Sequence, residues 1–184
     1  MWRVTDAPDL LTPSSADAAV RPARPGDAAA IGAVQARAWG RAFGAVVGPL
    51  DPAELAAAWA DAVTAAPSPR HAVLVATSGG TVVGFVAVAP ATDPDLGPDA
   101  GELVVLAVDP AHQGAGHGSR LLSAATSTLR DAGVTGVVAW LPLPDAVLQN
   151  FLTSAGMVAD GASRTLAAAD GTTVTQRRLT AALQ

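Results

Sequence analysis

Three glycines that precede an apolar segment are the part of the sequence with the clearest chemical potential. The run Gln113-Gly114-Ala115-Gly116-His117-Gly118 leads into residues 121–129, whose apolar side chains recur at the spacing of one helical face. Glycine leaves room for a ligand to approach the backbone, and free N–H groups at the start of a helix attract an anion such as pyrophosphate. The segment is therefore a candidate phosphate-binding loop.

The spacing of these glycines excludes two common phosphate-binding motifs. It is not the G-x-G-x-x-G of dinucleotide-binding folds, and no Gly-Lys-Ser/Thr follows, as a nucleoside-triphosphate loop requires. Taken alone, the glycines also fit ordinary turns in a plain α/β interaction domain. The elements around them must decide between these interpretations.

Apolar periodicity and turn residues predict the elements that position this loop. Helices are expected at 28–43, 52–64, 116–132 and 145–155, and strands at 18–24, 71–76, 81–89, 102–108, 136–141, 163–168 and 173–180. Tight turns at Ser78-Gly79-Gly80 and Asp170-Gly171 join two pairs of strands into hairpins. This order mixes hairpins with βαβ crossovers, so it predicts an α/β (α+β) domain with a central mixed sheet of about six to seven strands flanked by about four helices. Residues 1–17 lack periodicity and are expected to form a loose leader before a single domain at 18–184.

Composition and charge exclude several classes of function. Hydrophobic residues make up 50% of the chain, but no apolar run approaches the roughly 20 residues needed to cross a bilayer, and the first residues lack the apolar core of a signal peptide. We therefore expect a soluble, cytoplasmic protein without a membrane partner. The absence of cysteine excludes disulfides and a cysteine nucleophile, and three scattered histidines without paired carboxylates predict no metal site. The net charge of −5 disfavours nucleic acid as a partner and is compatible with a small cationic acceptor.

With its flanking residues, the glycine loop resembles the acyl-CoA signature of the GNAT superfamily of N-acyltransferases. The resemblance rests on Gln113-x-x-Gly116-x-Gly118, preceded by Leu106-Ala107-Val108-Asp109-Pro110 and followed by Leu121-Leu122. It extends from about residue 18, because the expected helix pair, hairpin, loop, and following strand and helix come in the family's order. It implies a single GNAT-like domain with a splayed sheet, and acetyl-CoA as the co-substrate.

The resemblance also implies where acetyl-CoA would bind. The pantetheine arm would lie between strands 102–108 and 136–141 and contact the backbone of Leu106, Ala107 and Val108. The pyrophosphate would be held by the backbone amides of Gln113, Gly114, Ala115, Gly116, His117, Gly118 and Ser119. In such a site the side chains matter little except at the glycines.

The implied reaction is direct attack of a primary amine on the thioester in a ternary complex, which needs a base for the amine and a proton for the departing thiolate. Glu102 holds a strand position at which some family members place a general-base glutamate, so it is the candidate catalytic residue. The alternative is that Glu102 merely begins a strand at a solvated edge. The loop acids Asp93, Asp95 and Asp99 either attract a cationic acceptor or are only solvated.

The sequence departs from the family at the proton donor. Many members carry a tyrosine at the position of Leu152, and this chain contains no tyrosine. The thiolate then takes its proton from another group or from water, or the protein is a non-catalytic acyl-CoA-binding regulatory domain. The polar neighbours Asn150, Thr153 and Ser154 fit a helix cap or a surface role. Asp145 stands where the family often has asparagine, and it is expected to cap the helix.

The first two helices wall the acceptor pocket in this family, so Trp39 and Phe43 are the candidate acceptor contacts, whereas Trp59 is expected in the core. A small amine, an amino acid, an antibiotic and a protein N-terminus all stay open as acceptors. Trp140 ends a strand near the expected splay of the sheet. The final strands at 163–180 can pair across a two-fold axis, which would make a homodimer.

Overall fold

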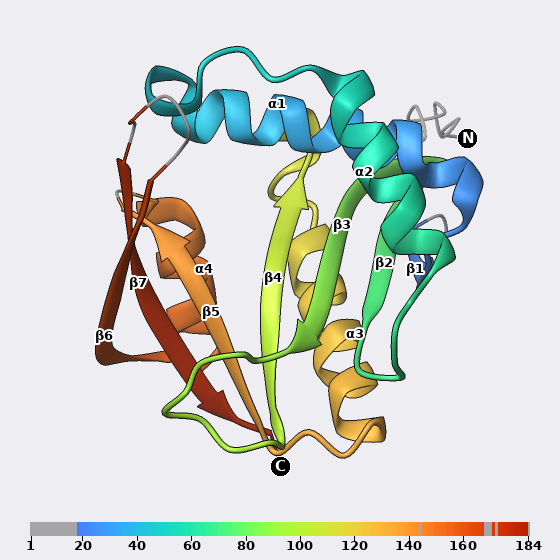
Figure 1. The fold of residues 1–184 in the computed structure, drawn as a ribbon. Coiled ribbons are helices and arrows are strands. Elements are labelled where there is room, and N and C mark those ends of the chain that lie inside the picture. Colours follow the sequence, from blue (N-terminus) through green and yellow to red (C-terminus); the bar gives the residue numbers. More distant parts are fainter. Residues whose placement is uncertain (1–17, 144, 168–170, 172, 184) are drawn as a thin grey trace, which may run out of the picture.

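The structure is a computed structural model that describes residues 18–143, 145–167, 171 and 173–183 (Figure 1). Its helices are α1 (Ala28–Val47), α2 (Pro52–Thr64), α3 (His117–Asp131) and α4 (Ala146–Ser154), with the short 3-10 turns η2 (Pro25–Asp27) and η3 (Pro110–His112). Its strands are β1 (Ala18–Pro22), β2 (Ala72–Ser78), β3 (Thr81–Pro90), β4 (Ala100–Val108), β5 (Gly136–Pro142), β6 (Val158–Ala167) and β7 (Thr173–Ala182). The expected leader at 1–17 and the turn residue Asp170 lie outside the described residues.

The seven strands form one open sheet in the order β1-β2-β3-β4-β5-β7-β6. Neighbouring strands run antiparallel except β4 and β5, which are parallel. The helices α1 and α2 cover one face of the sheet, and α3 and α4 cover the other (Figure 1). This mixed sheet with four helices in the described part of the chain confirms the predicted fold class.

Each face of the sheet has its own hydrophobic core. On one face, Leu121 and Leu129 of α3 are buried together with Leu152 of α4. On the other face, Ile31 and Val34 of α1 pack against the strands, because the spacing of these residues gives α1 one apolar side. The two cores fix the helices on either side of the sheet and so position the segments that leave it.

The helices α1 and α2 approach each other most closely at Gly32, which lies inside α1. An added Cβ at Gly32 would lie 2.6 Å from the carbonyl oxygen of Pro52 and 2.7 Å from the backbone nitrogen of Ala56, both in α2. These atoms belong to a helical backbone and cannot move away cheaply. The crossing of the first two helices therefore depends on the absence of a side chain at this position.

The strands β4 and β5 separate soon after they begin. They pair only at residues 100–102 of β4 and 136–138 of β5, the last pair being Glu102 with Val138. Beyond this point a bulge leaves Val104 as an extra residue, since Ala87 of β3 pairs with Val105 and Val88 pairs with Leu103. In residues 103–108, which the structure describes throughout, the edge of β4 that faces β5 therefore has no ladder partner.

Two elements begin or end more than two residues from their predicted bounds. The strand β6 starts at Val158, five residues before the predicted start at 163, and it includes the Asp160-Gly161 pair. The pair instead lies in an irregularity between Ala159 and Ser163, where Gly161 has a φ of +92°. Helix α1 runs four residues beyond its predicted end at 43 and stops before Gly48, whose φ is +66°.

Candidate active site

The glycine loop connects η3 to α3, and its backbone takes conformations that favour glycine. Gly114 and Gly116 have φ angles of +81° and +77°, and nothing lies within 4 Å of an added Cβ at Gly114. The first hydrogen bond of α3 runs from the N–H of Arg120 to the carbonyl oxygen of Gly116, so the N–H groups of residues 117–119 have no acceptor within the helix. The loop thus presents backbone donors at an exposed helix start, as an anion site requires.

The start of this loop is held by Asp109, a residue to which the sequence analysis gave no role. Its buried carboxylate accepts hydrogen bonds from Arg37 of α1 and from the backbone N–H of Ala111. Burial opposes ionisation, but the Ala111 N–H and Arg37 together outweigh it and hold the pKa of Asp109 below its ordinary value. The sequence signal for this role was Asp109-Pro110, a capping residue followed by proline at the first position of a helical turn.

The two histidines of the loop are less exposed than loop histidines usually are. His117 is only 5% exposed at the first position of α3, and burial, followed by Arg120 and His112, lowers its pKa. A neutral imidazole at this point leaves the anion site to the backbone. The Nδ1 atom of His112 is buried without a hydrogen-bond partner among the residues that the structure describes.

Leu106, Ala107 and Val108 lie on β4 after it has separated from β5, and on their other side they pair with residues 84–86 of β3. A groove of about 450 Å³ lies between α3, α4 and the strands beneath them, with Leu103 as its lining residue from β4. Ser119 at the start of α3 and Phe151 of α4 both line this groove, so it opens beside the glycine loop. Of the predicted coenzyme contacts, Ser119 is the one that lines this groove, and the others lie outside its lining.

Glu102 lies on the opposite face of the sheet from this groove. Its neighbours Gly101 and Leu103 face α3, so the alternation of a strand places Glu102 on the face that α1 covers. Burial raises the pKa of the half-buried Glu102 carboxyl, Arg164 acts against this, and Asp93 adds to it. A raised pKa makes Glu102 a stronger base than an exposed glutamate.

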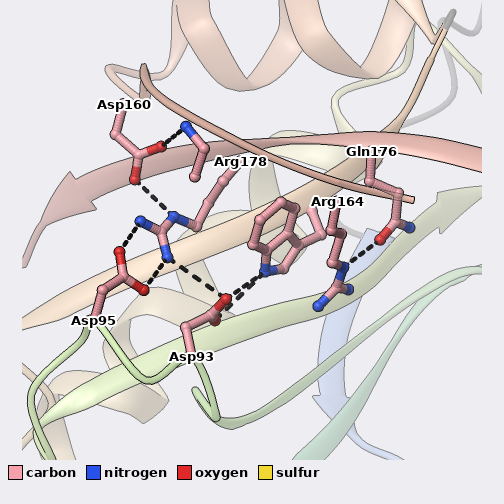
Figure 2. A network of polar contacts seen from close by, with 8 residues as sticks. Asp93, Asp95, Asp160, Arg164, Gln176 and Arg178 are labelled. Carbon is pink, nitrogen blue, oxygen red and sulfur yellow. Dashed lines mark hydrogen bonds and ion pairs between the residues drawn. The ribbon is translucent and has the colours of Figure 1, made fainter. Parts of the chain in front are cut away.

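A network of polar contacts surrounds Trp140 on the same face (Figure 2). At its centre is Arg178 of β7, whose side chain is only 6% exposed and which pairs with Asp93 (3.5 Å), Asp95 (2.8 Å) and Asp160 (2.7 Å). Trp140 donates its indole N–H to Asp93, and Arg178 lies 5.5 Å from the centre of the Trp140 ring. The network joins the loop after β3 to β5, β6 and β7.

The three loop aspartates are engaged within the chain, which favours a structural role over attraction of a cationic acceptor. Asp93 and Asp95 bind Arg178, and Asp99 pairs with Arg70 at 3.2 Å. Sequence reasoning missed both arginine partners because Arg178 is 83 residues from Asp95. The sequence offered no signal for Arg178, because it stands beside a second arginine, Arg177.

The aromatic residues of the first two helices separate into two groups. Trp59 packs on Phe85 at 5.0 Å between ring centres and donates its indole N–H to Gln35, so it packs against the core, as predicted. Trp39 and Phe43 contact each other on α1 at 6.3 Å, with both side chains partly exposed. The described ring contacts of Trp39 and Phe43 do not connect them to Glu102 or Trp140.

Three neighbouring residues of α4 that the sequence analysis considered for the proton donor, residues 152–154, are engaged within the fold. Leu152 is fully buried in the core under α3. The hydroxyls of Thr153 and Ser154 donate to backbone carbonyls of α4 itself, at residues 149 and 151. Asp145 accepts from the N–H of Leu148 and caps the helix, as predicted.

Comparison with known proteins identifies one family whose sequence model matches most of the chain. The model of the family described as "Acetyltransferase (GNAT) family" matches residues 35–157. Among proteins of curated function, none matches the chain significantly in sequence. In the described residues, no helix is long and apolar enough to span a membrane, and no group of three or more possible metal ligands occurs.

Solved structures share the fold at low sequence identity. The yncA protein of Salmonella typhimurium, whose structure contains its cofactor acetyl-CoA, is 23% identical, with a TM-score of 0.68 over 91% of this chain and 95% of that chain. The ribosomal-protein-alanine N-acetyltransferase of Brucella melitensis is 22% identical, with a TM-score of 0.71 over 90% and 99% of the two chains. The paia N-acetyltransferase of Thermoplasma acidophilum, in complex with coenzyme A, is 15% identical, with a TM-score of 0.65 over 87% and 97%.

Proposed function

Because the chain belongs to the GNAT family of acetyltransferases, we propose that it transfers the acetyl group of acetyl-CoA to the nitrogen of a primary amine. The observation that supports this most strongly is the combination of a separated β4 edge with a glycine loop at the start of α3. The first feature leaves backbone groups of β4 without a strand partner, and the second leaves N–H groups at the start of α3 without an acceptor in the helix. They suit a long ligand that carries amides at one end and a pyrophosphate near the other.

The chain's own residues fit such a co-substrate. We assign the pyrophosphate to the backbone N–H groups of residues 113–119, because Gly114 and Gly116 keep the loop open and the helix start favours negative charge. We assign the pantetheine amides to the free edge of β4 at residues 106–108. Acetyl-CoA supplies an activated thioester, and the protein supplies orientation and a base.

Glu102 is the base in this proposal. The nitrogen of the amine attacks the thioester carbonyl, its proton passes to the Glu102 carboxylate, the carbon–sulfur bond breaks, and the acetyl group stays on nitrogen. The raised pKa of Glu102 suits proton removal, and its place at the last paired residue of β4 puts it where the strands separate. Water gives the proton to the thiolate, since a thiol with a pKa of about 8.5 leaves without strong acid assistance and Leu152 holds the family's tyrosine position inside the core.

A second candidate function is supported by one observation. The chain contains no tyrosine, so an acyl-CoA-binding regulatory domain without catalysis retains the same donor site. Both functions predict binding of acetyl-CoA, and only the enzyme releases free thiol when an amine is supplied. A third interpretation, a plain interaction domain, predicts no affinity for acetyl-CoA.

The test is calorimetric titration with acetyl-CoA, followed by detection of free thiol with a panel of amines. Gly116→Trp should abolish binding, because the added ring fills the loop. Gly133→Trp is the matched control, since Gly133 also has a positive φ, of +78°, and open space around it, but lies after the far end of α3. If the native chain does not bind acetyl-CoA, or if both variants bind equally well, the proposed donor site is wrong.

A further inference from the structure

Arg164 of β6 is a cation whose hydrogen-bonding groups are largely unused. Its Nε donates to Gln176 of β7 at 2.7 Å, and Figure 2 shows this as the single dashed line at its guanidinium. Among the residues that the structure describes, neither Nη atom of Arg164 has a hydrogen-bond partner, and no carboxylate lies within 4 Å. Its neighbour Arg178, by contrast, is paired with three aspartates.

The position of Arg164 is nevertheless well determined. Its guanidinium lies over the ring of Trp140, 4.3 Å from the ring centre, and the bond to Gln176 fixes its rotation. Trp140 is in turn held by the hydrogen bond from its indole N–H to Asp93, and Asp93 is held by its ion pair with Arg178. The arginine is therefore oriented before any ligand arrives, which reduces the entropy lost on binding.

Arg164 also lies close enough to the candidate base to influence it. The charge of Arg164 acts on the pKa of Glu102, so the two side chains share one region on the α1 face of the sheet. Trp140 lies two residues beyond Val138, which pairs with Glu102, on the same face of β5. An acceptor whose nitrogen approaches Glu102 thus has an oriented guanidinium beside it.

We propose that Arg164 binds a carboxylate of the acceptor and that the acceptor is a free α-amino acid. This inference rests on the proposed function. A guanidinium with two open Nη atoms matches the two oxygens of a carboxylate. In an α-amino acid the carboxylate is separated from the amine by a single carbon, so the two groups can reach Arg164 and Glu102 from one small molecule.

The surrounding charges favour a carboxylate over a phosphate. A dianionic group gains most from two cations, but the nearest second cation, Arg178, is already bound by Asp93, Asp95 and Asp160. Asp93 and Glu102 also lie nearby and repel excess negative charge. A group with a single negative charge is therefore the anion that this site accommodates.

The test uses the full chain saturated with coenzyme A and compares each of the twenty amino acids with its α-amide. The pair differs only in the carboxylate, and the amide's amine loses its proton more easily, so it would be the better acceptor without Arg164. We expect at least one amino acid to raise the melting temperature and to bind, by calorimetry, about 10- to 100-fold more tightly than its amide. Arg164→Gln should remove this preference and leave the affinity of the amide within about 2-fold.

Arg177→Gln is the control, because Arg177 is an exposed arginine on β7 one residue from the network. It should keep the preference for the amino acid. The inference is overturned if no amino acid binds, if the amides bind as tightly as the acids, or if Arg164→Gln weakens both equally. These readouts need no turnover, so the absence of thiol release with any amine would refute the proposed catalysis separately.

Discussion

Arg37 of α1 donates to one carboxylate oxygen of Asp109 from both Nε and Nη2, at 2.9 and 2.6 Å. The two residues are 72 positions apart, and their contact joins the helix over one face of the sheet to the turn that opens the glycine loop. The contact therefore links the element expected to wall the acceptor with the element expected to hold the donor.

Replacing this carboxylate should destabilise the protein in a pH-dependent way. Because the pKa of Asp109 is lowered in the folded protein, its contribution is complete above the ordinary aspartate pKa and disappears as the pH falls through the folded value. We expect Asp109→Asn to lose about 1–3 kcal/mol of unfolding free energy at pH 7. Urea denaturation between pH 7 and pH 3 should show the native and variant curves converging at the acid end. A difference that persists unchanged at pH 3 would contradict the role given to the ionised carboxylate.

Replacing Glu102 should change activity and stability in opposite directions. The raised pKa means that ionisation of Glu102 opposes folding, and this penalty grows as the pH rises from the unfolded value through the folded value. Glu102→Gln should therefore melt at a higher temperature than the native protein at pH 7, with the gap closing below about pH 4. The same variant should lower kcat/KM by about 100-fold, because it has no base for the amine.

The pH dependence of the native enzyme provides an independent check on Glu102. The rate should rise with pH along a limb whose apparent pKa lies above that of an ordinary glutamate, and this limb should be absent from the residual activity of Glu102→Gln. If the variant retains native kcat/KM, Glu102 only begins a strand, and the base must be sought elsewhere.

The close crossing of α1 and α2 predicts opposite effects on stability for alanine substitutions at two glycines of α1. Gly32→Ala should lower the unfolding free energy by about 1–3 kcal/mol, because its Cβ meets the backbone of α2 at 2.6 Å. Gly40→Ala should instead raise it by about 0.5–1 kcal/mol, since Gly40 has nothing within 4 Å and alanine is the better helix former. Thermal or urea denaturation of the two variants compares them directly, and equal effects would show that the crossing adapts to the added methyl.

Local patterns were enough to predict the glycine loop and the elements on either side of it. Glycines 114 and 116 and the apolar face of α3 are set within a few neighbouring residues, so their structure follows from nearby sequence. The parallel pairing of β4 with β5 also follows, since a helix connects them. The separation of these strands was expected only from the family resemblance.

The network around Trp140 was not predictable in this way. Arg178 and Asp95 meet across 83 residues, and nothing in the sequence distinguishes a buried arginine from the exposed Arg177 beside it. The start of β6 has no regular local pattern, since an Asp-Gly pair, typical of turns, lies in the irregularity between Ala159 and Ser163. Long-range pairing decided both features, and single-sequence patterns carry little information about it.

The match to the GNAT family ends at residue 157, and both arginines around Trp140 lie beyond it, on β6 and β7. These two strands form a hairpin at one edge of the sheet, whereas the glycine loop belongs to its centre. Under the proposed function, the arginine assigned to the acceptor therefore lies outside the matched stretch, whereas the loop assigned to the donor lies inside it. If the proposal holds, substitutions on this hairpin would change the choice of acceptor and leave the backbone groups of the glycine loop in place.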